Sequence, residues 1–301
     1  MRQRAESISA RTEITIRQLN KFYGQKQALR EVSLQIGKGM FGLLGRNGAG
    51  KTTLMKILSS LSAKSSGEIS ICGTPVEKAA EIRRLIGYLP QDFSMYPHMT
   101  VYEAMDYLGV LSGLGRAERK KRIAALLERV NLGDCHKVKV KALSGGMKRR
   151  LGIAQAILHD PKVLIVDEPT AGLDPEERIR FRNLLCEIAE DRIVILSTHI
   201  VGDVEATCEN IAILDGGRLL YQGTAKALTD TAAGKVYNLK VSKRELDSIK
   251  ASYIVTGMLT LGDEVTVRIL ADEKPCPNAV LCEPNIEDAY MLKMGGSSNV
   301  H

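Results

Sequence analysis

The sequence predicts an α/β protein. We expect a mixed β-sheet core with an antiparallel β portion and a helical subdomain, followed by a small α+β unit. A short apolar run, Met40–Leu44, leads through a glycine-rich turn into a helical pattern. Short apolar runs then alternate with helical segments, which is typical of a parallel sheet covered by helices. After Gly223 the pattern changes to a separate group of short strands and helices.

The amino-terminal part is predicted to be antiparallel. From Glu13 to Ile36 apolar and polar residues alternate around Gly24, as in strands that have one buried face. A helix is expected from Lys51 to about Ser60. Two more short strands follow, Gly67–Gly73 and Ile86–Pro90.

The middle of the chain is predicted to be helical before the buried strands resume. From Thr100 onward, apolar residues recur at helical spacing. The predicted elements are helices at 100–111, 119–130, 144–157 and 175–189, strands at 163–166 and 193–197, and a hairpin of 211–215 and 218–221 that turns at Gly216-Gly217.

These patterns predict two domains. The main domain covers residues 13–223, with its helical subdomain at about 92–158, and the small α+β domain covers 235–294. In the small domain we expect a strand, a helix, two strands and a final helix, at 236–241, 243–251, 253–259, 264–270 and 286–294. Residues 1–12 and 295–301 are expected to be loose tails.

Composition narrows the class of protein. The chain has 301 residues, of which 44% are hydrophobic and 26% charged, as in ordinary globular proteins. Because no apolar run approaches the roughly 20 residues of a membrane span, and Met1–Arg11 lacks a signal-peptide core, we expect a cytoplasmic protein. The net charge of +7 comes from short, interrupted clusters, which favours a solvated basic face. Six cysteines without CxxC spacing favour reduced, structural thiols.

One segment has the pattern of a phosphate-binding loop. Gly45-Arg46-Asn47-Gly48-Ala49-Gly50-Lys51-Thr52 follows a predicted strand and opens a helix, which is the context that the pattern requires. Its glycines permit a tight turn, and its amides and helix N-terminus attract a polyphosphate. We expect Lys51 to reach the β- and γ-phosphates, Thr52 to bind Mg²⁺ and Thr53 to help hold the α-phosphate. The alternative is a glycine-rich turn without a ligand.

Two adjacent acids follow a buried strand. Asp167 and Glu168 come directly after Val163–Val166, so they lie at a strand's carboxyl end, where parallel sheets place their ligand crevice. Neighbouring side chains in a strand point to opposite faces unless the strand ends, and Pro169 supports an end at this point. A solvated Asp-Glu turn is the alternative.

A second glycine-containing segment, Leu143-Ser144-Gly145-Gly146-Met147, lies between the phosphate loop and these acids. Ser144 is a good N-cap for the helix that follows, and Gly145 and Gly146 permit close approach of an anion. An ordinary helix start can have the same residues. The order of all the motifs along the chain favours an anion site.

Four single residues, Tyr23, Gln91, Asp174 and His199, lie around these motifs. Taken together, these residues and the motifs, in this order over about Glu13–Gly223, resemble the ATP-binding cassette family. The resemblance implies an ATPase that uses ATP and Mg²⁺. It also implies individual roles: Tyr23 stacks on adenine, Gln91 touches Mg²⁺ and the attacking water, Asp167 orients Mg²⁺, Glu168 is the general base, His199 contacts the γ-phosphate, and Asp174 crosses a subunit interface.

The same resemblance implies a working pair of ATPase subunits, either two copies of this chain or this chain with a related one. The pair closes head to tail around two ATP molecules, each held by Lys51 of one chain and by Ser144, Gly145 and Gly146 of the other. A separate transmembrane permease is the expected partner. The protein would then lie on the inner face of the cell membrane, and no nucleic-acid partner is expected.

The segment Glu283-Pro284-Asn285-Ile286-Glu287-Asp288-Ala289-Tyr290 resembles the terminal segment of the bacitracin- and daunorubicin-resistance type of bacterial exporter ATPase. Asn285 and Tyr290 depart from that pattern. This second resemblance implies export.

Two other classes of function are alternatives. A soluble cassette ATPase acting on ribosomes or nucleic acid would suit the basic charge, but sustained heptads and paired CxxC motifs do not occur here. Salt-sensitive binding of nucleic acid would favour that class. A signalling GTPase would need an Asn-Lys-x-Asp sequence, whereas Asn20-Lys21-Phe22 is followed by Tyr23.

Overall fold

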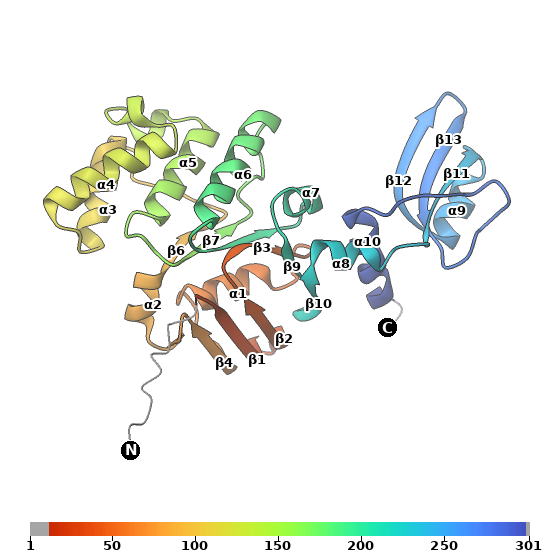
Figure 1. Cartoon of the computed structure of the whole chain (residues 1–301), viewed down its shortest axis with the longest axis horizontal. Coiled ribbons are helices and arrows are strands. Elements are labelled where there is room, and N and C mark those ends of the chain that lie inside the picture. Colours follow the sequence, from red (N-terminus) through yellow and green to blue (C-terminus); the bar gives the residue numbers. More distant parts are fainter. Residues whose placement is uncertain (1–11, 299–301) are drawn as a thin grey trace, which may run out of the picture.

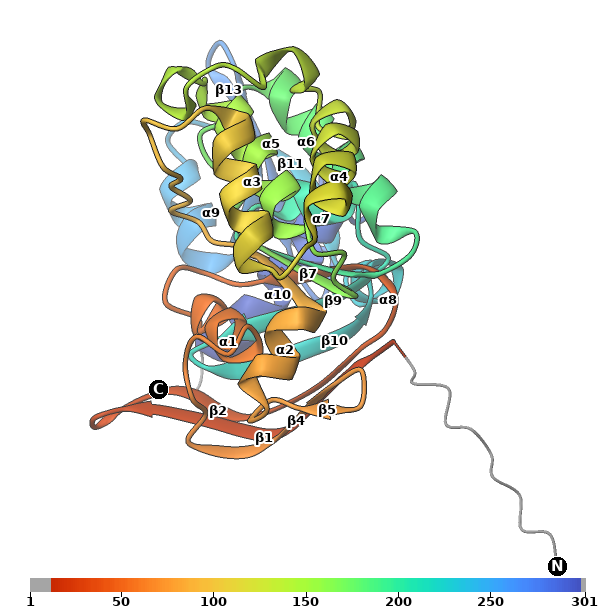
Figure 2. The same cartoon turned by 90° about the vertical axis from the view of Figure 1, so that its left-hand side faces the viewer.

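The computed structural model describes residues 12–298, and it has the predicted α/β fold (Figure 1). The predicted tails at 1–11 and 299–301 lie outside the described residues. A helical layer and an antiparallel sheet lie on opposite sides of a central sheet, as the view turned by 90° also shows (Figure 2).

The antiparallel sheet comes from the amino-terminal part, as the alternating pattern predicts. Its strand order is β2-β1-β4-β5. Irregular pairing interrupts β1 between Ile16 and Leu19, where Gln18 has a positive φ of 47°. The strands are β1 (Ile14–Tyr23), β2 (Lys26–Ile36), β4 (Ser66–Ile71) and β5 (Thr74–Pro75).

The central sheet has the strand order β10-β9-β3-β8-β7-β6 and is parallel except for the β9–β10 hairpin. Both of its faces are buried. Val163 and Ile165 of β7 pack with the antiparallel sheet, whereas Leu164 and Val166 pack with the helical layer. This explains the continuous apolar runs of these strands. The strands are β3 (Gly39–Leu44), β6 (Ile86–Leu89), β7 (Val163–Asp167), β8 (Ile193–Thr198), β9 (Asn210–Asp215) and β10 (Arg218–Thr224).

Helices cover both faces of this sheet. The first begins directly at the phosphate loop, and a capping box formed by Thr100 and Glu103 starts the first helix of the helical subdomain. Arg119 holds Asp106 at 2.6 Å and so ties two helices of that subdomain together. The helices are α1 (Lys51–Leu58), α3 (Val101–Leu111), α4 (Arg116–Arg129), α5 (Gly145–Ala156) and α6 (Pro175–Ala189), with 3-10 turns at Gly133–Cys135 and Val140–Ala142.

Three short helices were not predicted from the sequence: α2 (Ala79–Leu85), α7 (Val201–Glu205) and α8 (Ala225–Asp230). In α2 only Ile82 is buried, and in α8 only Leu228, so neither has an apolar stripe. Periodicity cannot identify helices of two turns or less, because too few residues repeat.

The small unit has a four-stranded antiparallel sheet of its own, with the order β12-β13-β11-β14. The apolar residues Leu239, Val265 and Val267 form part of a core that is separate from those of the main domain. The elements are β11 (Val236–Ser242), α9 (Leu246–Ser252), β12 (Ile254–Leu261), β13 (Glu264–Leu270) and β14 (Val280–Leu281).

The last helix, α10 (Ile286–Ser298), packs on the main domain rather than on the core of the small unit. Ile286, Ala289 and Tyr290 belong to the same apolar cluster as the central sheet, and the helix contacts α7 and α8 (Figure 1). The helix also continues four residues past Met294. The expectation of a loose tail is therefore wrong for 295–298, because the helix remains packed at Met294.

One buried carboxylate joins α10 to the sheet of the small unit. Asp288 accepts hydrogen bonds from Arg268 Nη2 at 2.7 Å, Thr256 Oγ1 at 2.6 Å and the backbone amide of Asn285 at 2.9 Å. Burial by itself would raise the pKa of Asp288, but these hydrogen bonds outweigh it and hold the pKa below its ordinary value. The helix N-terminus is thereby fixed to strands β12 and β13.

Replacing Ile286 with alanine should lower the free energy of unfolding by roughly 2–4 kcal/mol, because a buried side chain is removed from the shared core. Urea unfolding of the full chain measures this change. The control is Val280→Ala, whose side chain is exposed and whose expected effect is about 0.5 kcal/mol or less. Equal, small effects from both variants would contradict the packing of α10 in the core.

Candidate functional site

The phosphate loop joins β3 to α1 as predicted. Gly48 and Gly50 have φ angles of 82° and 106°, which side chains other than glycine rarely adopt. A Cβ on Gly50 would also approach the carbonyl oxygen of Ala28 to 2.8 Å. Lys51 is buried, and its Nζ donates to the carbonyl oxygens of Gly45 at 2.7 Å and Arg46 at 3.3 Å. The loop therefore encloses the lysine ammonium group.

The two acids diverge at the end of β7. Asp167 is the last residue of the strand, and its Oδ1 accepts a hydrogen bond from Ser197 Oγ at 2.7 Å. Glu168 has a φ of 49°, and its amide donates to the Ser197 carbonyl at 2.8 Å. The strand ends at this point, as the following proline predicted, and Glu168 contacts the loop at Lys51 while Asp167 contacts Ser197. Burial, with Asp167 nearby, raises the pKa of Tyr88 to about 12, so this phenol stays neutral.

Glu168 connects the phosphate loop to His199, for which the resemblance implies contact with the γ-phosphate. Its Oε1 lies 3.3 Å from Lys51 Nζ, and its Oε2 lies 2.6 Å from Nδ1 of His199. His199 follows β8 directly, and β8 pairs with both β3 and β7. The three side chains thus meet because neighbouring parallel strands end at the same edge of the sheet.

Lys51 and Glu168 open onto a cavity of about 600 Å³, whereas the predicted residues Gly45, Asp167 and His199 are not among those that line it. Tyr23 lies at its rim, about half exposed, with Lys21 Nζ 4.8 Å from the centre of its ring. A hydrogen bond with Ser62, aided by Thr53 and Lys21, holds the pKa of Tyr23 below its ordinary value. The predicted residues that line the cavity are Tyr23, Arg46, Asn47, Gly48, Ala49, Gly50, Lys51, Thr52, Thr53, Gln91 and Glu168.

Gln91 reaches this cavity from the end of β6. The backbone at this point is held by Arg149 of α5, whose Nη1 donates to the carbonyl oxygen of Gln91 at 2.6 Å. Burial lowers the pKa of Arg149, although Asp92 acts in the opposite direction. The loop after Gln91 is therefore coupled to the helix that follows Ser144.

Ser144, Gly145, Gly146 and Asp174 do not line the cavity. Ser144 caps α5 by accepting from the amide of Met147 at 3.2 Å, and Asp174 caps α6 by accepting from the amide of Glu177 at 2.9 Å. The two helix starts are neighbours, because a Cβ on Gly146 would lie 2.5 Å from Glu177 Oε2. The predicted residues thus form two separate groups in one chain.

Comparison with known proteins identifies this arrangement. Residues 29–171 match the model of the family described as ABC transporter. The Nod factor export ATP-binding protein I of Cupriavidus pinatubonensis is 36% identical over 242 residues, which are 79% of this chain and 74% of that protein. The chain belongs to the ABC transporter ATP-binding family. It is an ATPase, and its substrate is ATP.

Two further comparisons agree with this assignment. The linearmycin resistance ATP-binding protein of Bacillus subtilis is 38% identical over 219 residues, covering 72% of this chain and 70% of that protein. A solved dimer of an ATP-binding cassette, in a post-hydrolysis state with ADP and phosphate, matches with a TM-score of 0.64 and 26% identity, covering 70% of this chain and 98% of that one. Among residues 12–298, no helix of this ABC protein is long and apolar enough to cross a membrane.

The ATPase site also fits the Mg²⁺ that the family implies. Asp167 is fully buried, and its Oδ2 has no hydrogen-bond partner in the described part of the chain. A buried carboxylate oxygen is costly unless a donor or cation satisfies it, and carboxylate and hydroxyl oxygens are the ligands that Mg²⁺ prefers. The loop residue Thr52, which carries a hydroxyl group, lines the ATP cavity.

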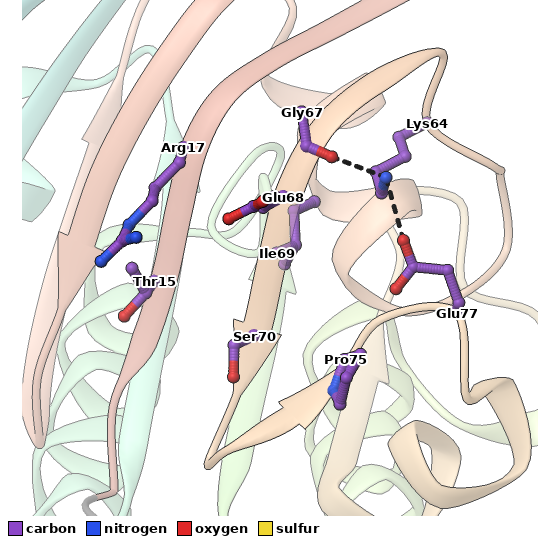
Figure 3. A pocket seen from close by; sticks show the side chains of 9 residues that line it. All are labelled: Thr15, Arg17, Lys64, Gly67, Glu68, Ile69, Ser70, Pro75 and Glu77. Atoms are coloured by element: carbon purple, nitrogen blue, oxygen red, sulfur yellow. Dashed lines mark hydrogen bonds and ion pairs between the residues drawn. The ribbon is translucent and has the colours of Figure 1, made fainter.

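The cavities that lie apart from the ATP site include two of comparable size. One of about 430 Å³ lies on the antiparallel sheet (Figure 3), where Lys64 Nζ is held by Glu77 at 2.9 Å and by the Gly67 carbonyl at 2.6 Å. The Lys64 cation is thus already paired, and Arg17 also lines this cavity. The other, of about 480 Å³, is lined by Phe93, Ser94, Met95, Pro97, Val140, Lys141 and Lys148.

The sequence did not indicate that Gly216 and Gly217, at the turn of the β9–β10 hairpin, also line the ATP cavity. The amide of Gly217 donates to the Ala49 carbonyl at 3.0 Å, and a Cβ there would lie 2.6 Å from the Ala28 carbonyl oxygen. The sequence predicted only the turn, because the close contacts of Gly217 are with segments that are distant in the sequence.

Gly217→Ala should lower the free energy of unfolding by about 1–3 kcal/mol, because the new methyl group meets backbone atoms. Gly216→Ala is the matched control, since Gly216 also has a positive φ but would meet nothing within 4 Å. Thermal unfolding of both variants measures the difference. Equal losses of stability would show that the positive φ, and not the close approach, decides the cost.

Proposed function

We propose that this protein is the ATP-hydrolysing subunit of an exporter and acts on a separate transmembrane permease. One observation supports its work as a pair: Ser144, Gly145 and Gly146 do not line the cavity that Lys51 and Glu168 share. A helix N-terminus capped by serine is a suitable anion site. Its use on ATP therefore requires a second cassette, with two chains head to tail around two nucleotides.

The relatives support export. One is described as a Nod factor export protein and another as a linearmycin resistance protein. The solved cassette with ADP and phosphate is dimeric. We infer the same direction of transport here, with the pair formed by two copies of this chain or by this chain and a related one, on the inner face of the membrane.

The site residues divide the reaction between them. Lys51 and the loop amides bind the phosphates and stabilise the charge that develops on the γ-phosphoryl oxygens. Glu168 accepts a proton from the attacking water, and His199 holds Glu168 and contacts the γ-phosphate. Thr52, Gln91 and Asp167 would hold Mg²⁺, which when bound would neutralise part of the phosphate charge.

The remaining residues bind the rest of ATP and the second chain. Tyr23 offers its exposed ring to adenine. We assign Asp174, at the start of α6, to contact across the pair; its position outside the ATP cavity supports this role.

The cavity lined by Phe93, Met95 and Pro97 is the proposed docking site for the permease. It combines apolar side chains with Lys141 and Lys148 and directly follows Gln91. Because Arg149 holds the Gln91 backbone, a segment bound in this cavity would be mechanically linked to the ATP site.

Glu168→Gln should lower ATP turnover by about 100-fold or more while ATP binding persists, because the general base is lost but the loop is intact. The closed ATP-bound pair should accumulate, which size-exclusion chromatography with ATP detects. Lys51→Ala is the contrasting variant, and it should weaken ATP affinity by about tenfold or more because a charge-assisted contact is lost. Rapid turnover by Glu168→Gln, or normal affinity in Lys51→Ala, would contradict these assignments.

The tagged protein should co-purify with a polytopic membrane protein from detergent-solubilised membranes of its host, as identified by mass spectrometry. Met95→Glu should lose that partner, because a charge enters the apolar cavity. Because Met95 is partly buried against the core, its thermal unfolding is measured alongside to confirm that the variant is folded. Leu261→Glu, at an exposed position of β12, is the control and should retain the partner. Recovery with ribosomal proteins or nucleic acid instead would support a soluble ATPase and overturn the transporter proposal.

A further inference from the structure

A second buried carboxylate lies close to the ATP site but outside its cavity. Asp203 of α7 is completely buried, four residues after His199. It does not line the ATP cavity. Burying a carboxylate is costly unless it is paired and hydrogen-bonded, so its partners define what it does.

Asp203 has partners from two other segments. Thr170 Oγ1 donates to its Oδ2, and Arg178 Nε donates to its Oδ1 at 2.6 Å. Arg182 Nη1 lies farther away, at 3.6 Å from Oδ1. Both oxygens of the carboxylate are therefore satisfied by protein groups, and both arginines come from α6.

Each partner lies a few residues from a residue of the ATPase site. Thr170 follows Glu168 by two positions, Arg178 follows Asp174 by four, and Asp203 follows His199 by four. Asp203 thus joins the segment of the general base, the helix that begins at Asp174 and the segment of the histidine. Moving any one of them alone would leave a buried charge or hydroxyl without its partner.

Helix α7 also packs closely against β3, the strand that leads to the phosphate loop. A Cβ on Gly42 of β3 would lie 2.6 Å from Val204 Cγ1, so the two segments are in close contact. Asp203 therefore lies on a helix that cannot shift freely, which makes it a suitable reference point for the three segments.

We propose that Asp203 is a positioning residue for ATP hydrolysis. It holds Glu168, His199 and Asp174 in their relative places, and it touches neither the nucleotide cavity nor the reacting atoms. Its effect is on the rate of the chemical step and on how the pair closes, rather than on capture of ATP by the phosphate loop. This inference rests on the ATPase activity and is independent of the permease.

The test uses Asp203→Asn in the full chain, with steady-state ATPase kinetics and binding of a fluorescent ATP analogue. We expect kcat to fall by about tenfold or more, because small displacements of catalytic groups raise the activation barrier. KM and the affinity for the analogue should change by about twofold or less. An unchanged kcat, or a higher KM with unchanged kcat, would overturn the proposal.

The chain provides a matched control in Asp288→Asn. Asp288 is also fully buried and also accepts from a threonine hydroxyl and an arginine Nε, from Thr256 and Arg268. Both variants should lose thermal stability, but only Asp203→Asn should lose turnover per folded molecule. Equal loss of turnover in both would mean that Asp203 acts only through stability, which contradicts the proposal.

Arg178 supplies a second route if Asp203→Asn does not fold. Its side chain is 31% exposed, so Arg178→Gln removes the ion pair without burying a new group. We expect the same fall in kcat at constant KM, and partial recovery in Arg178→Lys because the positive charge returns. Turnover at the unmodified rate in Arg178→Gln would contradict the proposed role of the pair.

Discussion

The structure depends on the parallel alignment of β3, β8 and β7. Because these strands run side by side in the same direction, their carboxyl ends meet at one edge, and the phosphate loop, His199 and the two acids follow those ends. Glu168 then bridges Lys51 and His199 with two short contacts. A buried ion pair of this kind adds little to stability by itself, since desolvation offsets much of its attraction. Its value is that it fixes the geometry of a site whose members are far apart in sequence.

The same constraint separates the predicted residues into two groups, which under the proposed pairing would belong to two different ATP sites. The edge of the central sheet supplies the phosphate loop and the acids, whereas Ser144 begins a helix in the helical subdomain and lies outside the cavity. Arg149, five residues after Ser144, holds the backbone of Gln91, so the two regions are nevertheless coupled within the chain. The start of α5 and the loop at Gln91 are therefore connected through a single side chain that does not involve the central sheet.

Local patterns predicted the main domain and most of the site because each motif carries its context: a strand, a glycine turn and a helix for the loop, and a strand end for Asp167. These local patterns could not predict the contacts between segments that are distant in the sequence. Asp203 looks like an ordinary polar residue in a short helical turn, and Gly217 like an ordinary hairpin glycine. The apolar residues of α10 predicted a helix, but not that Ile286 would pack into the core of the main domain.

Helix α7 shows how these unpredicted contacts combine. On one side Asp203 ties it to Thr170 and Arg178, and elsewhere Val204 packs against β3. Helix α10 contacts it from the small unit, whose sheet holds the start of α10 through Asp288. Interiors this closely packed transmit displacement rather than absorb it. The contact between α10 and α7 brings the carboxyl-terminal helix beside the segment that follows His199, while Asp203 ties that segment to α6 and Thr170.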